Sequence, residues 1–113
     1  MRRLLPVVLV AALAATLFAA IPAVSKRRNV EVGDDYFVRS GSPPTVRVNR
    51  NDRVVWEWEG SNPHNVTVTN GPARFRSRTQ SSGTYAKKVT RRGTYRILCT
   101  IHAPSMRMTL RVR

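Results

Sequence analysis

Apolar and polar residues alternate along most of the chain after residue 28. Val54, Trp56 and Trp58 fall on one face of such a stretch. Glu57 and Glu59 fall on the other face. This period of two places successive side chains on opposite faces of a half-buried strand. The pattern predicts about eight short strands, at residues 29–32, 45–49, 53–59, 65–69, 73–77, 84–89, 94–99 and 108–112.

Short turn signals separate these segments, and no window keeps a helical period for three turns. The signals are clusters of Asn, Asp, Gly, Pro, Ser and Arg at residues 51–52, 70–72, 81–83 and 91–93. About eight short strands in the 88 residues from 26 to 113 are typical of an antiparallel sandwich or barrel. We therefore expect residues 26–113 to form one all-β domain.

Residues 1–25 have a different pattern, which is that of a targeting segment. Arg2 and Arg3 are followed by residues 4–24, which carry no charge, and Ala23-Val24-Ser25 offers small residues for cleavage. This layout is typical of a secretory signal peptide. The same 21 apolar residues are also long enough for an uncleaved membrane anchor. Both interpretations place the domain outside the cytoplasm, where it is secreted, periplasmic or on the cell surface, and the second attaches it to a membrane.

Composition narrows the classes of protein further. The chain has 113 residues with a formal net charge of +14, and it contains a single cysteine. It is too short for a catalytic barrel, and one cysteine excludes both a disulfide framework and a multi-thiolate zinc finger. A small domain without disulfides needs another stabiliser, and a bound metal is a common one. The charge indicates either an anionic partner or simply a solvated basic surface, and no nucleic-acid-binding module is recognisable.

Four residues carry candidate chemistry. Cys99, His102 and Met106 lie in one segment between two predicted strands, and His64 precedes another strand. One thiolate, two imidazoles and a weak thioether are the ligand set of a blue copper centre. Each residue alone has a plainer explanation, as a buried small hydrophobe or a solvated histidine. A zinc site would have no use for the methionine, and a Cys–His nucleophile would need a substrate pocket that so small a chain hardly offers.

From residue 29 to its end the chain resembles the cupredoxins of the plastocyanin/azurin family. The segments that carry this resemblance are Pro44 to Val48, Asp52 to Trp56, Pro63-His64-Asn65-Val66, Gly93-Thr94-Tyr95 and Cys99-Thr100-Ile101-His102. The resemblance implies a small Greek-key β-sandwich that binds one type 1 copper ion, cycling between Cu(II) and Cu(I). His64, Cys99 and His102 would be the equatorial ligands and Met106 the axial ligand.

Two neighbours of these ligands also take roles from the resemblance. Asn65 would bond the thiolate through its backbone N–H and tie two loops together through its side chain. Met108 stands where the family commonly has glycine, so it is a second thioether near the site. Strand alternation puts Met108 on the same face as Met106, which leaves it as the competing axial ligand.

The resemblance further implies an exported one-electron carrier between protein redox partners, and not an enzyme. The outer edge of His102 would be exposed within an apolar patch, which we expect to include Pro63, Ala103 and Pro104. The basic charge favours an acidic redox partner, and no nucleic acid is expected. The alternative function is copper storage or delivery without redox partners. Three methionines, one of them the initiator, are few for that role.

Overall fold

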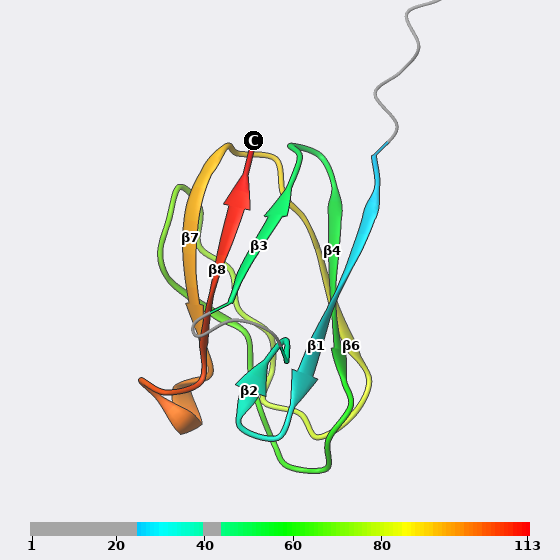
Figure 1. Cartoon of the computed structure of the whole chain (residues 1–113), viewed down its shortest axis with the longest axis vertical. Coiled ribbons are helices and arrows are strands. Elements are labelled where there is room, and N and C mark those ends of the chain that lie inside the picture. The colour runs from blue at the N-terminus through cyan, green and yellow to red at the C-terminus, as the bar shows by residue number, and fades with distance from the viewer. Residues whose placement is uncertain (1–24, 40–43) are drawn as a thin grey trace, which may run out of the picture.

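A computed structural model of the chain describes residues 25–39 and 44–113 as two four-stranded sheets packed face to face (Figure 1). One sheet has the strand order β2-β1-β4-β6 and the other β3-β8-β7-β5. The elements are β1 (Arg27–Gly33), β2 (Tyr36–Phe37), β3 (Thr45–Val48), β4 (Arg53–Trp58), β5 (Thr67–Asn70), β6 (Thr84–Lys88), β7 (Gly93–Leu98), the 3-10 turn η1 (Thr100–His102) and β8 (Arg107–Val112). The expected all-β sandwich of about eight strands is confirmed.

The predicted signal or anchor, apart from Ser25, lies outside the described residues. In the part of the chain that is described, no helix has the length and apolar character needed to cross a membrane.

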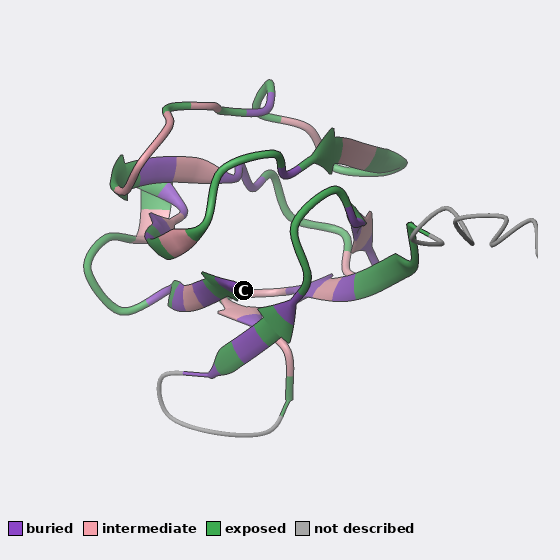
Figure 2. Ribbon diagram, turned by 90° about the horizontal axis from the view of Figure 1, so that it is seen from above, coloured by how far each residue is buried: buried purple, intermediate pink, exposed green. Residues whose placement is uncertain are grey.

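The core lies between the two sheets, and strands such as β3, β7 and β8 contribute every second side chain to it. Figure 2 shows this alternation as stripes of buried and exposed residues along the ribbons. Trp56 of β4 and Tyr95 of β7 are the two largest fully buried side chains. The Trp56 indole N–H donates to the Met108 sulfur of β8 over 3.5 Å, which links one sheet to the other. The observed register therefore agrees with the faces that the sequence pattern assigned.

The expectation of an antiparallel sandwich is wrong for two strand pairs. β1 pairs with β4 in parallel, and β3 pairs with β8 in parallel. The cause is the path of the chain, which crosses to the second sheet for β3 before it returns for β4. A period of two tells which face of a strand is buried, but it says nothing about which strand lies beside it.

Two segments also differ in detail from the sequence pattern. Residues 73–77 are not a strand of either sheet and form only an isolated bridge between Thr67 and Arg76. They still follow β5, because Val68 N–H donates to the Phe75 carbonyl at 3.0 Å and Phe75 packs against the core. The sequence pattern missed β2, because two residues are too few to show an alternation.

The direction of the strands brings four distant connections together at the lower end in Figure 1. They are the β1–β2 turn, the loop after β4, the loop before β6, and the loop between β7 and β8. The chain therefore folds so that residues separated by up to about seventy positions share this end of the sandwich.

Candidate metal centre

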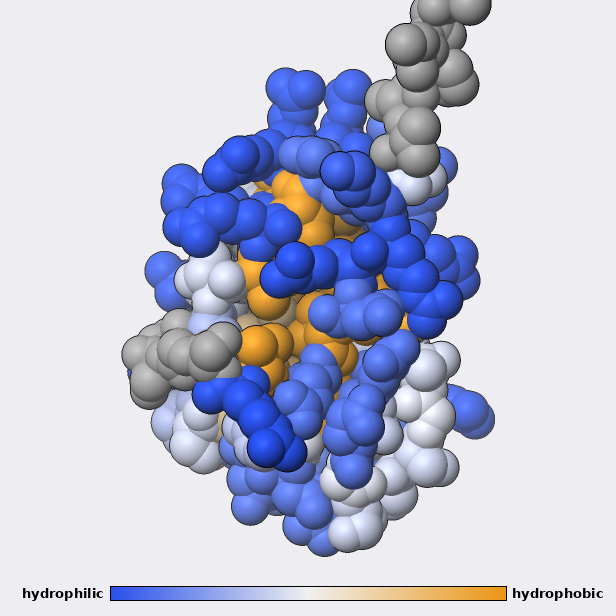
Figure 3. All heavy atoms as spheres, turned by 45° about the vertical axis from the view of Figure 1, so that its right-hand side comes forward, coloured by the Kyte–Doolittle hydropathy of each residue, from blue (hydrophilic) through white to orange (hydrophobic). Residues whose placement is uncertain are grey.

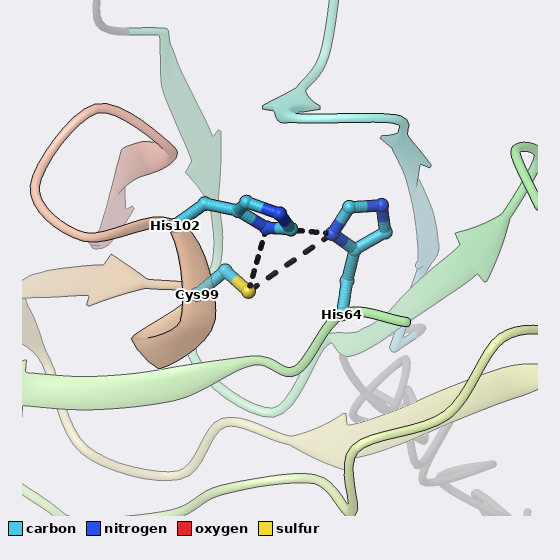
Figure 4. A group of neighbouring side chains, drawn as sticks. All are labelled: His64, Cys99 and His102. Carbon is cyan, nitrogen blue, oxygen red and sulfur yellow. Dashed lines mark hydrogen bonds between the residues drawn. The ribbon is translucent and has the colours of Figure 1, made fainter. Parts of the chain in front are cut away.

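His64, Cys99 and His102 lie together at this lower end, and their donor atoms face one another (Figure 4). His64 belongs to the loop between β4 and β5, while Cys99 directly follows β7 and His102 ends η1. The two histidine Nδ1 atoms are 3.2 Å apart. The Cys99 sulfur lies 3.6 Å from Nδ1 of His102 and 4.0 Å from Nδ1 of His64.

These distances fit a single metal ion between the three atoms. Bonds of about 2.0–2.1 Å to imidazole nitrogen and about 2.3 Å to thiolate sulfur, set about 120° apart, would separate the donors by about 3.6–3.8 Å. The three observed separations bracket this range. A trigonal set of one thiolate and two imidazoles is the arrangement that blue copper sites use. The donor set and its spacing therefore suit copper.

Backbone hydrogen bonds fix the segments that carry the ligands. His64 exchanges two bonds of 3.0 Å with Gln80, one through its N–H and one through its carbonyl. Cys99 N–H donates to the Met106 carbonyl at 3.0 Å, and Met106 N–H donates to the His102 carbonyl at 3.1 Å. The loop 99–106 is thus closed on itself by bonds that involve three of the four expected ligands.

The Asn65 side chain connects the two loops. Its oxygen accepts the Thr100 backbone N–H at 3.1 Å, and its amide nitrogen donates to the Thr100 hydroxyl at 2.8 Å. Thr100 directly follows Cys99, so these bonds hold the cysteine loop against the histidine loop. Asn65 itself is 5% exposed, which protects the bonds from competition by water.

The two methionines occupy different surroundings although both are buried. The Met108 sulfur accepts the Trp56 indole N–H in the core. Met106 is fully buried, and its backbone bonds directly to Cys99 and His102. The contact with Trp56 places the Met108 sulfur in the core between the sheets.

Each histidine directs its outer nitrogen at a carboxylate of the β1–β2 turn. His64 Nε2 lies 3.2 Å from Asp34 Oδ1, and His102 Nε2 lies 3.2 Å from Asp35 Oδ1. The Asn62 backbone N–H, then the His64 ring and the Ser61 N–H, hold the pKa of the Asp34 carboxyl below its ordinary value. Sequence analysis did not find these two aspartates, because no local spacing relates them to either histidine.

The cluster is enclosed on one side and reaches the surface on the other. His64 and Cys99 are fully buried, whereas the His102 side chain is 29% exposed. Beside His102, the exposed Ile101 is the large hydrophobic residue that stands out on the described surface. Pro63, Ala103 and Pro104 of the expected apolar patch are also exposed. The sequence pattern missed Ile101, because a single apolar residue in a loop gives no signal of its own.

Comparisons with known proteins agree with this geometry. A family model described as copper binding proteins, plastocyanin/azurin family, matches residues 40–113. The Cu(I) form of an amicyanin mutant is 27% identical, with 85% of this chain and 90% of that chain covered and a TM-score of 0.65. A reduced amicyanin mutant is 26% identical with the same coverages and TM-score. No curated protein sequence matches the chain.

A larger protein shares the fold alone. The copper-containing nitrite reductase from Thermus scotoductus SA-01 is 20% identical, with 77% of this chain covered and a TM-score of 0.64. The match spans only 22% of that reductase. The family match covers most of the described domain, and the three donor atoms in it suit one type 1 copper ion. This chain therefore belongs to the plastocyanin/azurin family of copper-binding proteins.

Proposed function

We propose that this protein is an exported carrier of single electrons between protein redox partners. In this proposal His64, Cys99 and His102 are the equatorial copper ligands, and Met106 is the axial ligand. The observation that carries it is the triangle of two Nδ1 atoms and one sulfur at one end of the sandwich, with two of its three residues fully buried. The leader pattern of residues 1–25 supports export.

Copper, when bound, supplies the one-electron change between Cu(II) and Cu(I). The residues of the chain supply a fixed geometry for both oxidation states. Two hydrogen-bonded loops hold the donors, and the Asn65 bonds to Thr100 keep these loops from separating. Little therefore has to rearrange when an electron arrives or leaves.

The surface around His102 is the proposed contact for redox partners. The ring reaches the surface next to Ile101, while the other histidine ligand is enclosed. Pro63, Ala103 and Pro104 add apolar surface that can exclude water from a transient contact. A partner docked there would lie close to the exposed ligand edge, which is the short path for an electron.

The same features speak against copper storage or delivery. A protein that hands over its metal needs ligands that an acceptor can reach. Here the Cys99 sulfur and the His64 ring have no exposed surface. No enzymatic reaction is proposed, and the likeness to nitrite reductase concerns only the fold.

Spectroscopy and kinetics together test the proposal. The copper-loaded protein should show intense absorption in the visible red from the copper–thiolate bond, and it should lose that band on one-electron reduction and regain it on oxidation. Repeated cycling without metal loss supports a carrier. Release of copper to a chelator upon reduction would instead support delivery and overturn the proposal.

A further inference from the structure

We propose that Asp34 and Asp35 are positioning residues of the copper centre, each accepting the outer N–H of one histidine ligand so that both Nδ1 atoms face Cys99. The inference rests on the ligand assignment made under the proposed function. It adds a role for the β1–β2 turn, which carries none of the four proposed ligands.

The geometry of the turn carries the inference. Two consecutive carboxylates reach two histidines that are 38 positions apart in the sequence, each at 3.2 Å from an Nε2 atom. One turn therefore holds the orientation of both rings. Elsewhere in proteins, metal-bound histidines commonly donate their second ring N–H to a carboxylate or carbonyl, which fixes the ring and raises its basicity.

The Asp34 carboxylate is itself held in place. It accepts the backbone N–H groups of Asn62 at 2.9 Å and Ser61 at 3.2 Å, in addition to the His64 ring. Gly60 makes room for it, because a Cβ at that position would overlap the carboxylate. The same group thus organises residues 60–64 and points the His64 ring inward.

The Asp35 carboxylate is placed by the backbone of the turn. Asp35 has a φ of 70°, a left-handed conformation that aspartate adopts more readily than most residues. Its side chain is 62% exposed, and its Oδ1 atom lies 3.2 Å from the outer nitrogen of the partly exposed His102. The two aspartates therefore hold one enclosed and one exposed ligand in the same manner.

The consequence for the histidines follows from their chemistry. A neutral imidazole carries one N–H, and a carboxylate next to Nε2 keeps the proton there. Both Nδ1 atoms then present lone pairs to each other and to the Cys99 sulfur across 3.2–4.0 Å. The two Nδ1 lone pairs, 3.2 Å apart, repel each other, so the histidine pair is preorganised for a cation, and binding one relieves the repulsion.

The carboxylates also act through their charge. Two negative groups at the outer edges of the ligands favour the more positive oxidation state of the centre. They should therefore lower the reduction potential relative to a centre whose histidines bond to neutral groups. A role limited to folding would not change the potential in this way.

Three variants with the same change of charge test the inference. Asp34→Asn and Asp35→Asn remove a carboxylate beside a histidine but keep an amide oxygen that can accept its N–H. Glu59→Gln is the matched control, because Glu59 is exposed and adjoins Gly60, and its carboxylate contacts neither histidine among the described hydrogen bonds. Voltammetry should give a higher reduction potential for both aspartate variants and an unchanged potential for the control. Equal shifts in all three variants would overturn the inference in favour of net charge alone.

A measurement without copper separates this inference from the proposed function. In the copper-free protein, nitrogen NMR should find the ring proton on Nε2 of both His64 and His102. Asp34→Ala should populate the other tautomer of His64 and weaken copper binding about 10–100-fold. Protons on Nδ1 in the wild-type protein would overturn the positioning role even if the copper-loaded protein is blue. A colourless wild-type protein with protons on Nε2 would instead overturn the proposed function.

Discussion

The two ends of the sandwich use charge in opposite ways. At the metal end, the loop 99–106 contains no lysine, arginine, aspartate or glutamate, and the turn beside it contributes two aspartates. At the other end, where β1 starts and β8 finishes in Figure 1, a surface hollow is lined by basic residues. They are Lys26, Arg27, Arg28, Arg47 and Arg113. Figure 3 shows deep-blue, strongly hydrophilic side chains crowded at that upper end, whereas toward the lower end white side chains are mixed with blue ones.

The two ends therefore differ in what they can bind, and the net charge of the whole chain does not reveal this difference. At the metal end, a thiolate and two imidazoles form a donor set that suits copper. At the other end Asp52 accepts the backbone N–H groups of Asn49 at 2.8 Å and Lys26 at 3.0 Å, which organises a turn beneath the basic side chains. Basic side chains also lie nearer the metal end, where Arg76 and Arg78 line a hollow with Asn65 and Thr100, so the net charge alone does not tell the two ends apart.

Replacing the thiolate should have the largest effect at the metal end. Cys99→Ser should abolish the red-region absorption of the copper-loaded protein, because a hydroxyl cannot form the soft covalent bond that produces it. Absorption spectra of the two copper-loaded proteins measure the change. Persistence of the band in the serine variant would contradict the assignment of Cys99 as a ligand.

Copper itself should stabilise the domain by a large amount. Binding to the native state alone adds about 2.7 kcal/mol to the free energy of unfolding at a copper concentration 100 times Kd. For a domain of this size that amounts to an increase in Tm of roughly 10–20 °C. Calorimetry of the copper-free and Cu(II) forms checks it. Coincident melting curves would mean that the three donors do not form a tight site.

The two buried methionines should respond differently to leucine. Met106→Leu should raise the reduction potential and leave copper bound, because an axial thioether tunes the metal more than it holds it. Met108→Leu should change the potential less and cost under about 1.5 kcal/mol of stability, mainly by removing the sulfur that Trp56 contacts. Voltammetry and chemical unfolding of both variants measure these effects. The opposite order of potentials would identify Met108 as the axial ligand.

The basic charges at the two ends should differ slightly in how strongly they affect the rate of electron transfer. Arg107→Gln at the metal end and Arg28→Gln at the basic end remove the same charge from exposed positions. With an acidic redox partner, electron transfer should slow as ionic strength rises from about 0.01 to 0.2 M, and Arg107→Gln should reduce this dependence more. Stopped-flow rates test both points. Identical slopes for the variants would show that only net charge steers the partner, and flat rates throughout would assign the charge to solvation.

The strands could be predicted because their signal is local. Alternation along 53–59 already placed Val54, Trp56 and Trp58 on the buried face, where the structure has them. The pairing of β1 with β4 could not be predicted, because it depends on where the chain crosses between sheets. Residues 73–77 could not be predicted correctly for the same reason. Their alternating pattern is typical of a strand, but the backbone beside them pairs with them only through one isolated bridge.

The candidate donors could also be predicted, because the chain contains few residues of the required types. The chain has one cysteine and two histidines, so a site with soft and imidazole ligands had few residues to draw on. Cys99, His102 and Met106 lie within eight consecutive positions, which places them in one loop whatever the topology. His64 lies 35 positions before Cys99, so residue type alone made it a candidate and the family resemblance then gave it the role of an equatorial ligand.

The sequence by itself thus determined most of the strands, the candidate donors and the resemblance to the family. Tertiary structure alone decided that Asp34 and Asp35 face the histidines, that Trp56 contacts Met108, and that five basic residues line one hollow opposite the metal end. The physical reason is the separation along the chain of the residues that interact. Alternation and loop spacing are set by neighbouring residues along the chain, whereas these contacts form between segments that only the packing of two sheets brings within hydrogen-bonding distance.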